Sequence, residues 1–215
     1  MIEKITDKKE LLQKFRTEGI LHAAIKVIAQ RGLEKATMEQ VAEEAGISKA
    51  TIYLYFKNKE DLYYHCVMTR FEKIMCLMRQ AVDGIDDPIE RIKILVDTQI
   101  KAIEVEKDFF RVFFTERMNL FLDQTTDFGQ GFFKRHEEYE ALVTGALIEG
   151  MERGSLREID PRKAFNLLFS MVRGMAMFNI LCGRQGSLSS EAGLILDVFF
   201  NGLNPGDRSR PHQAD

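Results

Sequence analysis

Apolar residues recur at intervals of three and four along most of the 215-residue chain. This spacing places them on one face of an α-helix, and the alternating runs typical of strands are almost absent. The pattern therefore predicts an all-α fold. We expect helices over residues 8–31, 59–80, 88–104, 108–122, 132–153, 161–182 and 190–203, two short helices within 37–57, and a loop over 124–131. The inward side of the first helix is expected to carry Phe15, Ile20, Ala24, Val27 and Ile28.

Local signals between residues 37 and 59 describe two short helices joined by a tight turn. Thr37 and Gln40 have the spacing of a capping box, in which a hydroxyl and an amide satisfy each other's backbone N–H groups. Gly46 can end the first helix in the left-handed conformation, and Ser48 can begin the second. Two short helices around such a turn make a helix-turn-helix. Its core is expected to contain Val41, Ala45, Ile47 and Ile52, with Phe56 as a further anchor and Asn58 as the cap of the next helix.

Charge is distributed unevenly between the two parts of the chain. The net charge of −3 gives no overall sign of nucleic-acid binding. Residues 1–80, however, hold 14 Lys and Arg against 11 Asp and Glu, whereas residues 81–215 hold 16 against 22. This asymmetry is compatible with a first part that faces DNA and an acidic body.

The N-terminal charges, the cysteines and the histidines indicate the cellular compartment and the kinds of chemistry that are absent. Charges between Glu3 and Glu10 and the lack of an apolar run near 18 residues argue against a signal peptide or a membrane span, so we expect a cytoplasmic protein. Cys66, Cys76 and Cys182 lack the paired spacing of a zinc site, and we expect them to be buried, reduced thiols. Scattered histidines and the lack of a phosphate loop or a placed nucleophile argue against an enzyme, and no metal or cofactor is expected.

A longer pattern runs from Ile20 to Leu62. It comprises Ile20-Leu21-His22-Ala23-Ala24, Gly32-Leu33, Ala36-Thr37-Met38 and the continuous stretch from Val41 to Leu62. On these residues the chain resembles, without a gap, the DNA-binding domain of TetR-family transcriptional regulators. The resemblance implies a helix-turn-helix domain over residues 8–57 and a helical ligand-binding and dimerisation domain over 58–203, with a connecting helix over 58–80. Residues 204–215, rich in proline, glycine and charge, are expected to be a disordered tail.

The resemblance also implies which residues face operator DNA. Thr37 and Lys59 stand at helix N-termini, where they suit phosphate oxygens. Lys49 can reach guanine, and Thr51 can touch a thymine methyl or a phosphate. The positions implied to contact DNA are Thr37, Ser48, Lys49, Ala50, Thr51, Tyr53, Tyr55 and Lys59.

Two of the neighbouring positions leave alternatives open. Tyr55 falls where the family often places a residue that contacts the DNA backbone, but it is also compatible with a core tyrosine beside Phe56. Leu54 departs from the polar or aromatic residue common at its position, which puts a DNA contact there in doubt.

The last two helices are apolar nearly all round. One hairpin cannot bury that much surface in a small monomer, and in the family the matching helices pair with their mates as a four-helix bundle. We therefore expect a homodimer. The interface residues predicted are Phe165, Leu168, Val172, Ile195, Val198 and Phe199; the alternative is that they close the monomer's own core.

An apolar small-molecule effector is the last expectation. Aromatic residues crowd the segment 108–122, and methionines on other helices suit a pocket of irregular shape. The residues predicted to bind the ligand are Met75, Met78, Phe114, Arg117, Met118, Phe121, Met171 and Met175. The alternatives are that these side chains are plain core, and that the chain is a DNA-binding factor controlled by a protein partner without a small ligand.

Overall fold

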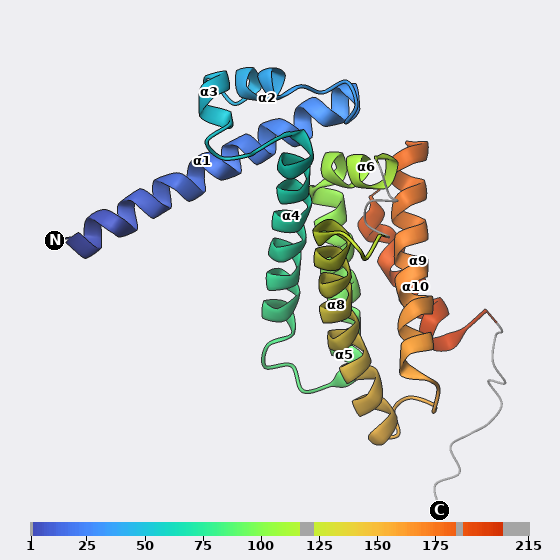
Figure 1. Ribbon diagram of the computed structural model, residues 1–215. Helices are drawn as coiled ribbons and strands as arrows, with labels where there is room; N and C mark the ends of the chain where they lie inside the picture. Colours follow the sequence, from blue (N-terminus) through green and yellow to red (C-terminus); the bar gives the residue numbers. More distant parts are fainter. Residues whose placement is uncertain (1, 117–122, 184–186, 204–215) are drawn as a thin grey trace, which may run out of the picture. The chain divides into compact units, whose positions relative to one another are not determined.

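The computed structural model describes residues 2–116, 123–183 and 187–203, and every regular element within these ranges is a helix (Figure 1). The all-α prediction is confirmed. The helices are α1 (Ile2–Arg31), α2 (Met38–Glu44), α3 (Lys49–Ile52), α4 (Lys59–Val82), α5 (Pro88–Val105), α6 (Lys107–Thr115), α8 (Asp127–Glu152), α9 (Pro161–Cys182), the 3-10 turn η1 (Leu188–Ser190) and α10 (Glu191–Asn201).

The chain forms two compact units. Unit 1 contains residues 1–76 and 106–138, and unit 2 contains residues 77–105 and 139–215. Two of the three boundaries fall within α4 and within α8, so each of these helices contributes to both units, and the third falls between α5 and α6. The sequence predicted a division after residue 57 into a DNA-binding domain and a ligand-binding domain. The two compact units are divided at other residues, and the division by function stays a prediction. The expected tail, residues 204–215, lies outside the described residues.

Helix α1 packs against α2 and α6 in unit 1. It begins at Ile2, earlier than the predicted start at residue 8, and ends at Arg31, where Gly32 adopts a φ of +78°. Ile20, Ala24, Val27 and Ile28 are buried as predicted. The prediction for Phe15 is wrong, because its side chain is 77% exposed and the described buried residues of α1 begin only at Ile20.

Helix α8 begins earlier than the sequence indicated. The predicted loop over 124–131 gives way to helix from Asp127, because the Thr126 hydroxyl accepts a hydrogen bond from the Gly129 amide (3.1 Å) and caps the first turn. A Cβ on Gly131 would lie 3.0 Å from the Tyr64 hydroxyl, so this glycine allows α8 to approach α4 within unit 1. Helix α6 ends at Thr115, before the predicted end at residue 122, and residues 117–122 lie outside the described residues.

Phenylalanine rings form a cluster beside α4 in unit 1. The Phe71 ring packs edge-on against Phe109, Phe113 and Phe132, with ring centroids 5.1–5.9 Å apart. Edge-to-face contacts at these separations are the favourable arrangement for aromatic rings. The aromatic segment therefore supplies core packing between α4, α6 and α8 in this unit.

Helices α5, α9 and α10 pack together in unit 2. Asp160 caps α9 by accepting hydrogen bonds from the amides of Arg162 and Lys163. The Glu104 carboxylate accepts hydrogen bonds from the hydroxyl of Ser187 (3.0 Å) and the amide of Leu188 (3.0 Å), which fixes the turn before α10.

The predicted dimer residues need correction. Phe165, Leu168, Val172 and Ile195 are buried inside unit 2, because this face of α9 and α10 packs on the unit's own core. Val198 and Phe199 are half-buried. The burial of the first four residues fits the alternative prediction, that they close the monomer's own core.

One expectation from composition is also corrected. Cys66 is buried, but Cys76 and Cys182 are exposed, and all three are free thiols.

Among the described helices, α9 is long and apolar enough by length and composition to cross a membrane, and 33% of its most apolar 18-residue window is buried. Its apolar surface thus exceeds what unit 2 covers.

Candidate nucleic-acid interface

Helix α2 begins with the predicted capping box. The Thr37 hydroxyl accepts a hydrogen bond from the Gln40 amide (3.2 Å), and the Gln40 side chain accepts one from the Thr37 amide (3.1 Å). Two backbone N–H groups that the helix cannot satisfy are thereby paired. Thr37 itself stays exposed at the start of the helix, where the sequence placed a phosphate contact.

The turn after α2 closes as the sequence indicated. Gly46 adopts a φ of +67°, and the Ile47 amide donates to the Ala42 carbonyl (2.9 Å). Val41, Ile52 and Phe56 are buried beneath the turn, whereas Ala45 and Ile47 are only partly buried. The predicted core is confirmed except that Ala45 and Ile47 lie at its edge, facing a cavity.

Helix α3 is a single capped turn. The Ser48 hydroxyl accepts a hydrogen bond from the Thr51 amide (3.1 Å) and lies 2.8 Å from the Thr51 hydroxyl. Ile52 points inward, and Lys49, Ala50 and Tyr53 are exposed. The inward anchor therefore fixes which side chains the helix presents outward.

Lys49 already has a partner in the free protein. Its ammonium forms an ion pair with the Glu39 carboxylate of α2. The hydrogen bond from Lys49 lowers the pKa of Glu39 and, reciprocally, raises the pKa of Lys49. Both side chains are exposed, so Glu39 competes with any other anion for this ammonium.

Helix α4 begins with a reciprocal cap of its own. The Asp61 amide donates to the Asn58 side chain (2.8 Å), and the Lys57 amide donates to the Asp61 carboxylate (2.9 Å). The Lys59 ammonium donates to the Glu34 carbonyl (2.9 Å) and so ties α4 to the segment before α2. Because an ammonium has three donors, this bond leaves capacity for a phosphate.

Tyr55 and Leu54 differ sharply in exposure. Tyr55 is partly buried, with its ring centroid 6.4 Å from that of Phe56, and it lines a cavity rather than the interior. Leu54 is 83% exposed. Tyr55 therefore lies at the edge of the core beside Phe56, and its contact with the DNA backbone stays a prediction. The exposed side chain at position 54 is apolar.

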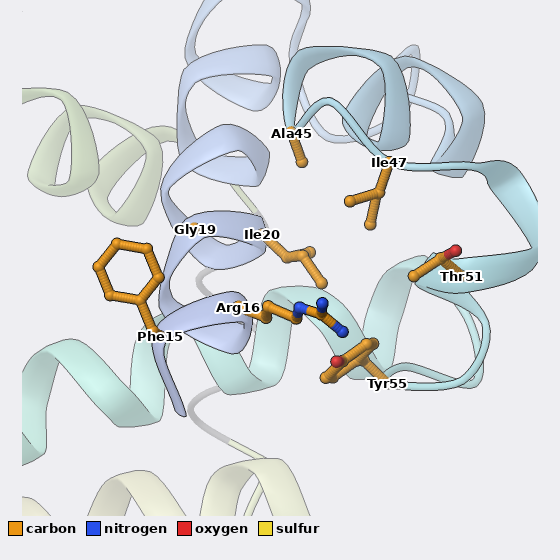
Figure 2. A pocket seen from close by; sticks show the side chains of 8 residues that line it. All are labelled: Phe15, Arg16, Gly19, Ile20, Ala45, Ile47, Thr51 and Tyr55. Atoms are coloured by element: carbon orange, nitrogen blue, oxygen red, sulfur yellow. The ribbon is translucent and has the colours of Figure 1, made fainter. Parts of the chain in front are cut away.

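The cavity lies between α1 and the helix-turn-helix, within unit 1 (Figure 2). Its volume is about 400 Å³. Its walls come from α1 on one side and from the turn and α3 on the other, namely Phe15, Arg16, Gly19, Ile20, Ala45, Ile47, Thr51 and Tyr55. It brings two of the predicted DNA-facing residues, Thr51 and Tyr55, together with Arg16, which sequence reasoning missed.

The predicted ligand residues are divided between the two units. Met75 and Phe114 belong to unit 1, and Met78 belongs to unit 2 with Met171 and Met175. Met75 and Met78 are buried, and the other three are partly buried. Arg117, Met118 and Phe121 lie outside the described residues, so the effector site stays a prediction.

A capped helix-turn-helix that presents a short helix with exposed lysine, tyrosine and hydroxyl groups defines a DNA-binding protein. Family models agree with this class. The model described as bacterial regulatory proteins, tetR family, matches residues 20–66, and the model described as tetracyclin repressor-like, C-terminal domain, matches residues 85–177. The chain belongs to the TetR family of bacterial transcriptional regulators.

Similar proteins are transcription regulators rather than enzymes. The chain is 23% identical over 188 residues to the fatty acid metabolism regulator protein of Bacillus subtilis, covering 86% of this chain and 94% of that protein. It is 28% identical over 204 residues to the HTH-type transcriptional regulator RutR of Escherichia coli, covering 92% and 89%.

A solved structure shares the fold. The transcriptional regulator FadR from Bacillus subtilis, in complex with stearoyl-CoA, matches with a TM-score of 0.77 and 21% sequence identity, over 87% of this chain and 99% of that chain. At this identity the likeness concerns the fold alone.

Proposed function

We propose that this protein is a cytoplasmic, homodimeric repressor that binds a palindromic operator and leaves it when an apolar small molecule binds. The observation that carries the DNA part is the capped α3, which buries Ile52 and thereby turns Lys49 and Tyr53 outward. In a dimer the two copies of α3 would read half-sites about 34–36 Å apart, one turn of the duplex, or a multiple of it.

The proposed homodimer is supported by the outer face of α9. Residues spaced by three and four lie on one stripe of this helix, opposite its buried face. The stripe comprises Leu167, Gly174, Phe178 and Leu181, of which the leucines and the phenylalanine are 45–59% exposed. On α10, Leu194 is 55% exposed and Val198 is half-buried. An apolar patch of this kind marks an interaction surface, and two copies would form an isologous interface.

The proposed effector class is supported by two similar proteins. The matching Bacillus subtilis protein is called a fatty acid metabolism regulator, and the similar FadR structure holds stearoyl-CoA. A long acyl chain also suits the methionine and phenylalanine side chains that the sequence assigned to the ligand. We propose an acyl-CoA as the effector class and, within unit 2, Met78, Met171 and Met175 as residues near it.

Helix α4 provides a route for coupling. It runs without a break from Lys59 to Val82, about 36 Å at 1.5 Å per residue, and it passes through both units. A shift of α4 caused by the ligand would move the helix-turn-helix that Lys59 tethers. The ligand must bind better to the state that does not fit the operator, so operator DNA must weaken ligand binding by the same factor.

The test is operator binding with and without ligand. Footprinting of the DNA that flanks the protein's own gene identifies the site, and fluorescence anisotropy measures affinity with stearoyl-CoA or with free CoA as the matched control. We expect stearoyl-CoA to lower the affinity at least tenfold and CoA to leave it unchanged. Operator binding that no acyl-CoA changes would contradict the effector and favour control by a protein partner.

A further inference from the structure

The cavity beside α3 has one strongly charged side chain. Figure 2 shows Arg16 reaching from α1 toward Tyr55, with Thr51 on the opposite wall. The other lining residues are apolar or glycine, and none of the described residues that line the cavity is acidic. The apolar wall made by Ile20 and Ile47 suits the aliphatic stem of an arginine whose charged end remains in water.

The described side chains of α1 place no acid at a position that would pair with Arg16. The positions three and four residues away on α1 are Leu12, Gln13, Gly19 and Ile20, so an ion pair along the helix cannot form. Glu18, two residues away, pairs with Lys73 at 2.9 Å instead. Among the residues whose side chains the structure describes, no ion pair of Arg16 is found, which leaves its guanidinium available to an anion.

The residues that line the cavity indicate which anion could bind there. Thr51 and Tyr55 belong to the surface that we propose to face DNA. The Tyr55 hydroxyl can donate to an oxygen atom, and the Thr51 hydroxyl can do so when it accepts the hydrogen bond from the Ser48 hydroxyl, 2.8 Å away. Guanidinium groups bind phosphate through two parallel N–H donors, which positions the phosphate as well as attracting it. We propose that Arg16, Thr51 and Tyr55 form a cradle for one backbone phosphate of the operator, extending the DNA interface from the helix-turn-helix onto α1. This inference rests on the proposed operator binding.

The test compares two charge-removing variants on one helix. Arg16→Gln removes the guanidinium from the cradle. Lys14→Gln removes an equal charge from an exposed side chain two residues away, which points about 200° around the helix. Operator affinity is measured by anisotropy for wild type and both variants between 50 and 300 mM salt, about the range in which phosphate contacts dominate the salt dependence.

We expect Arg16→Gln to weaken operator binding about tenfold and to reduce the slope of log affinity against log salt by about one. Lys14→Gln should change the affinity less than threefold, with nearly the wild-type slope. Arg16→Lys should retain the slope and lose part of the affinity, because it keeps the charge but not the two parallel donors.

Three results would overturn the cradle. The first is Arg16→Gln with wild-type affinity and slope, which would mean that the cavity does not take a DNA phosphate. The second is an equal loss in Lys14→Gln, which would mean that only overall charge matters. The third is a shift in thermal unfolding of Arg16→Gln large enough to explain its loss. Wild-type protein that binds no operator would instead refute the proposed function, so the two failures are distinguishable.

Discussion

The Lys49 ammonium of α3 pairs with the Glu39 carboxylate of α2, across the turn of the helix-turn-helix. The pair joins the one basic side chain of α3 to an acid on the preceding helix. In the free protein Lys49 is therefore held by an internal anion, and binding to DNA must exchange Glu39 for a base edge or a phosphate.

Glu39→Gln should strengthen operator binding. The substitution removes the competing carboxylate and leaves Lys49 free, so we expect the affinity to rise by about threefold or more at low salt, with the gain shrinking as salt screens the charges. The matched control is Glu43→Gln, an exposed acid one turn further along α2 that changes the net charge equally. An equal gain in both variants would show that general charge, rather than release of Lys49, is responsible.

Leu167→Glu should dissociate the proposed dimer. It places a carboxylate in the middle of the apolar stripe of α9, where pairing would bury an uncompensated charge at a cost of several kcal/mol. Sedimentation velocity should show a monomer. The control is Asn166→Glu, on the adjacent exposed position outside the stripe, which should remain dimeric. A dimeric Leu167→Glu variant would place the interface elsewhere.

The three thiols should differ in reactivity. Burial raises the pKa of Cys66 to about 12, and its thiol donates to the Leu21 carbonyl with a sulfur–oxygen distance of 3.6 Å. Because the reactive form is the thiolate, a thiol with so high a pKa is unreactive near neutral pH. We expect native protein to label rapidly at the exposed Cys76 and not at Cys66, and all thiols to label in denaturant. Rapid labelling of native Cys66 would contradict its burial.

Two glycines of α8 should respond in opposite directions to alanine. A Cβ on Gly150 would lie 2.8 Å from a Leu156 methyl carbon, whereas a Cβ on Gly145 would meet nothing within 4 Å. We expect Gly150→Ala to lower the free energy of unfolding by about 1–3 kcal/mol and Gly145→Ala to raise it by about 0.5–1 kcal/mol. Chemical denaturation measures both, and equal effects would mean that Leu156 moves aside at no cost.

Sequence reasoning succeeded where the signals are local. The caps at Thr37, Ser48 and Asn58 and the left-handed Gly46 each depend on a few adjacent residues, so the helix-turn-helix could be predicted nearly residue by residue. The start of α8 was missed because the Thr126 cap lies beside glycines that resemble a loop.

Tertiary relationships could not be predicted in the same way. The sequence indicates that α9 is apolar all round, but only packing on α5 and α10 decides that Leu168 faces inward and Leu167 outward. The cavity at Arg16 was missed for the same reason. It arises from the approach of α1 to the turn between α2 and α3, which no local pattern describes.

The central claim is that the outer face of α3 reads operator DNA, and the most direct measurement is the operator affinity of a Lys49→Ala/Tyr53→Ala double variant. Both side chains are exposed, so the variant should fold and dimerise like wild type. We predict that wild type saturates a footprinted operator duplex at two protomers per site, and that the double variant binds it at least a hundredfold more weakly. Equal affinity of the two proteins would contradict the account.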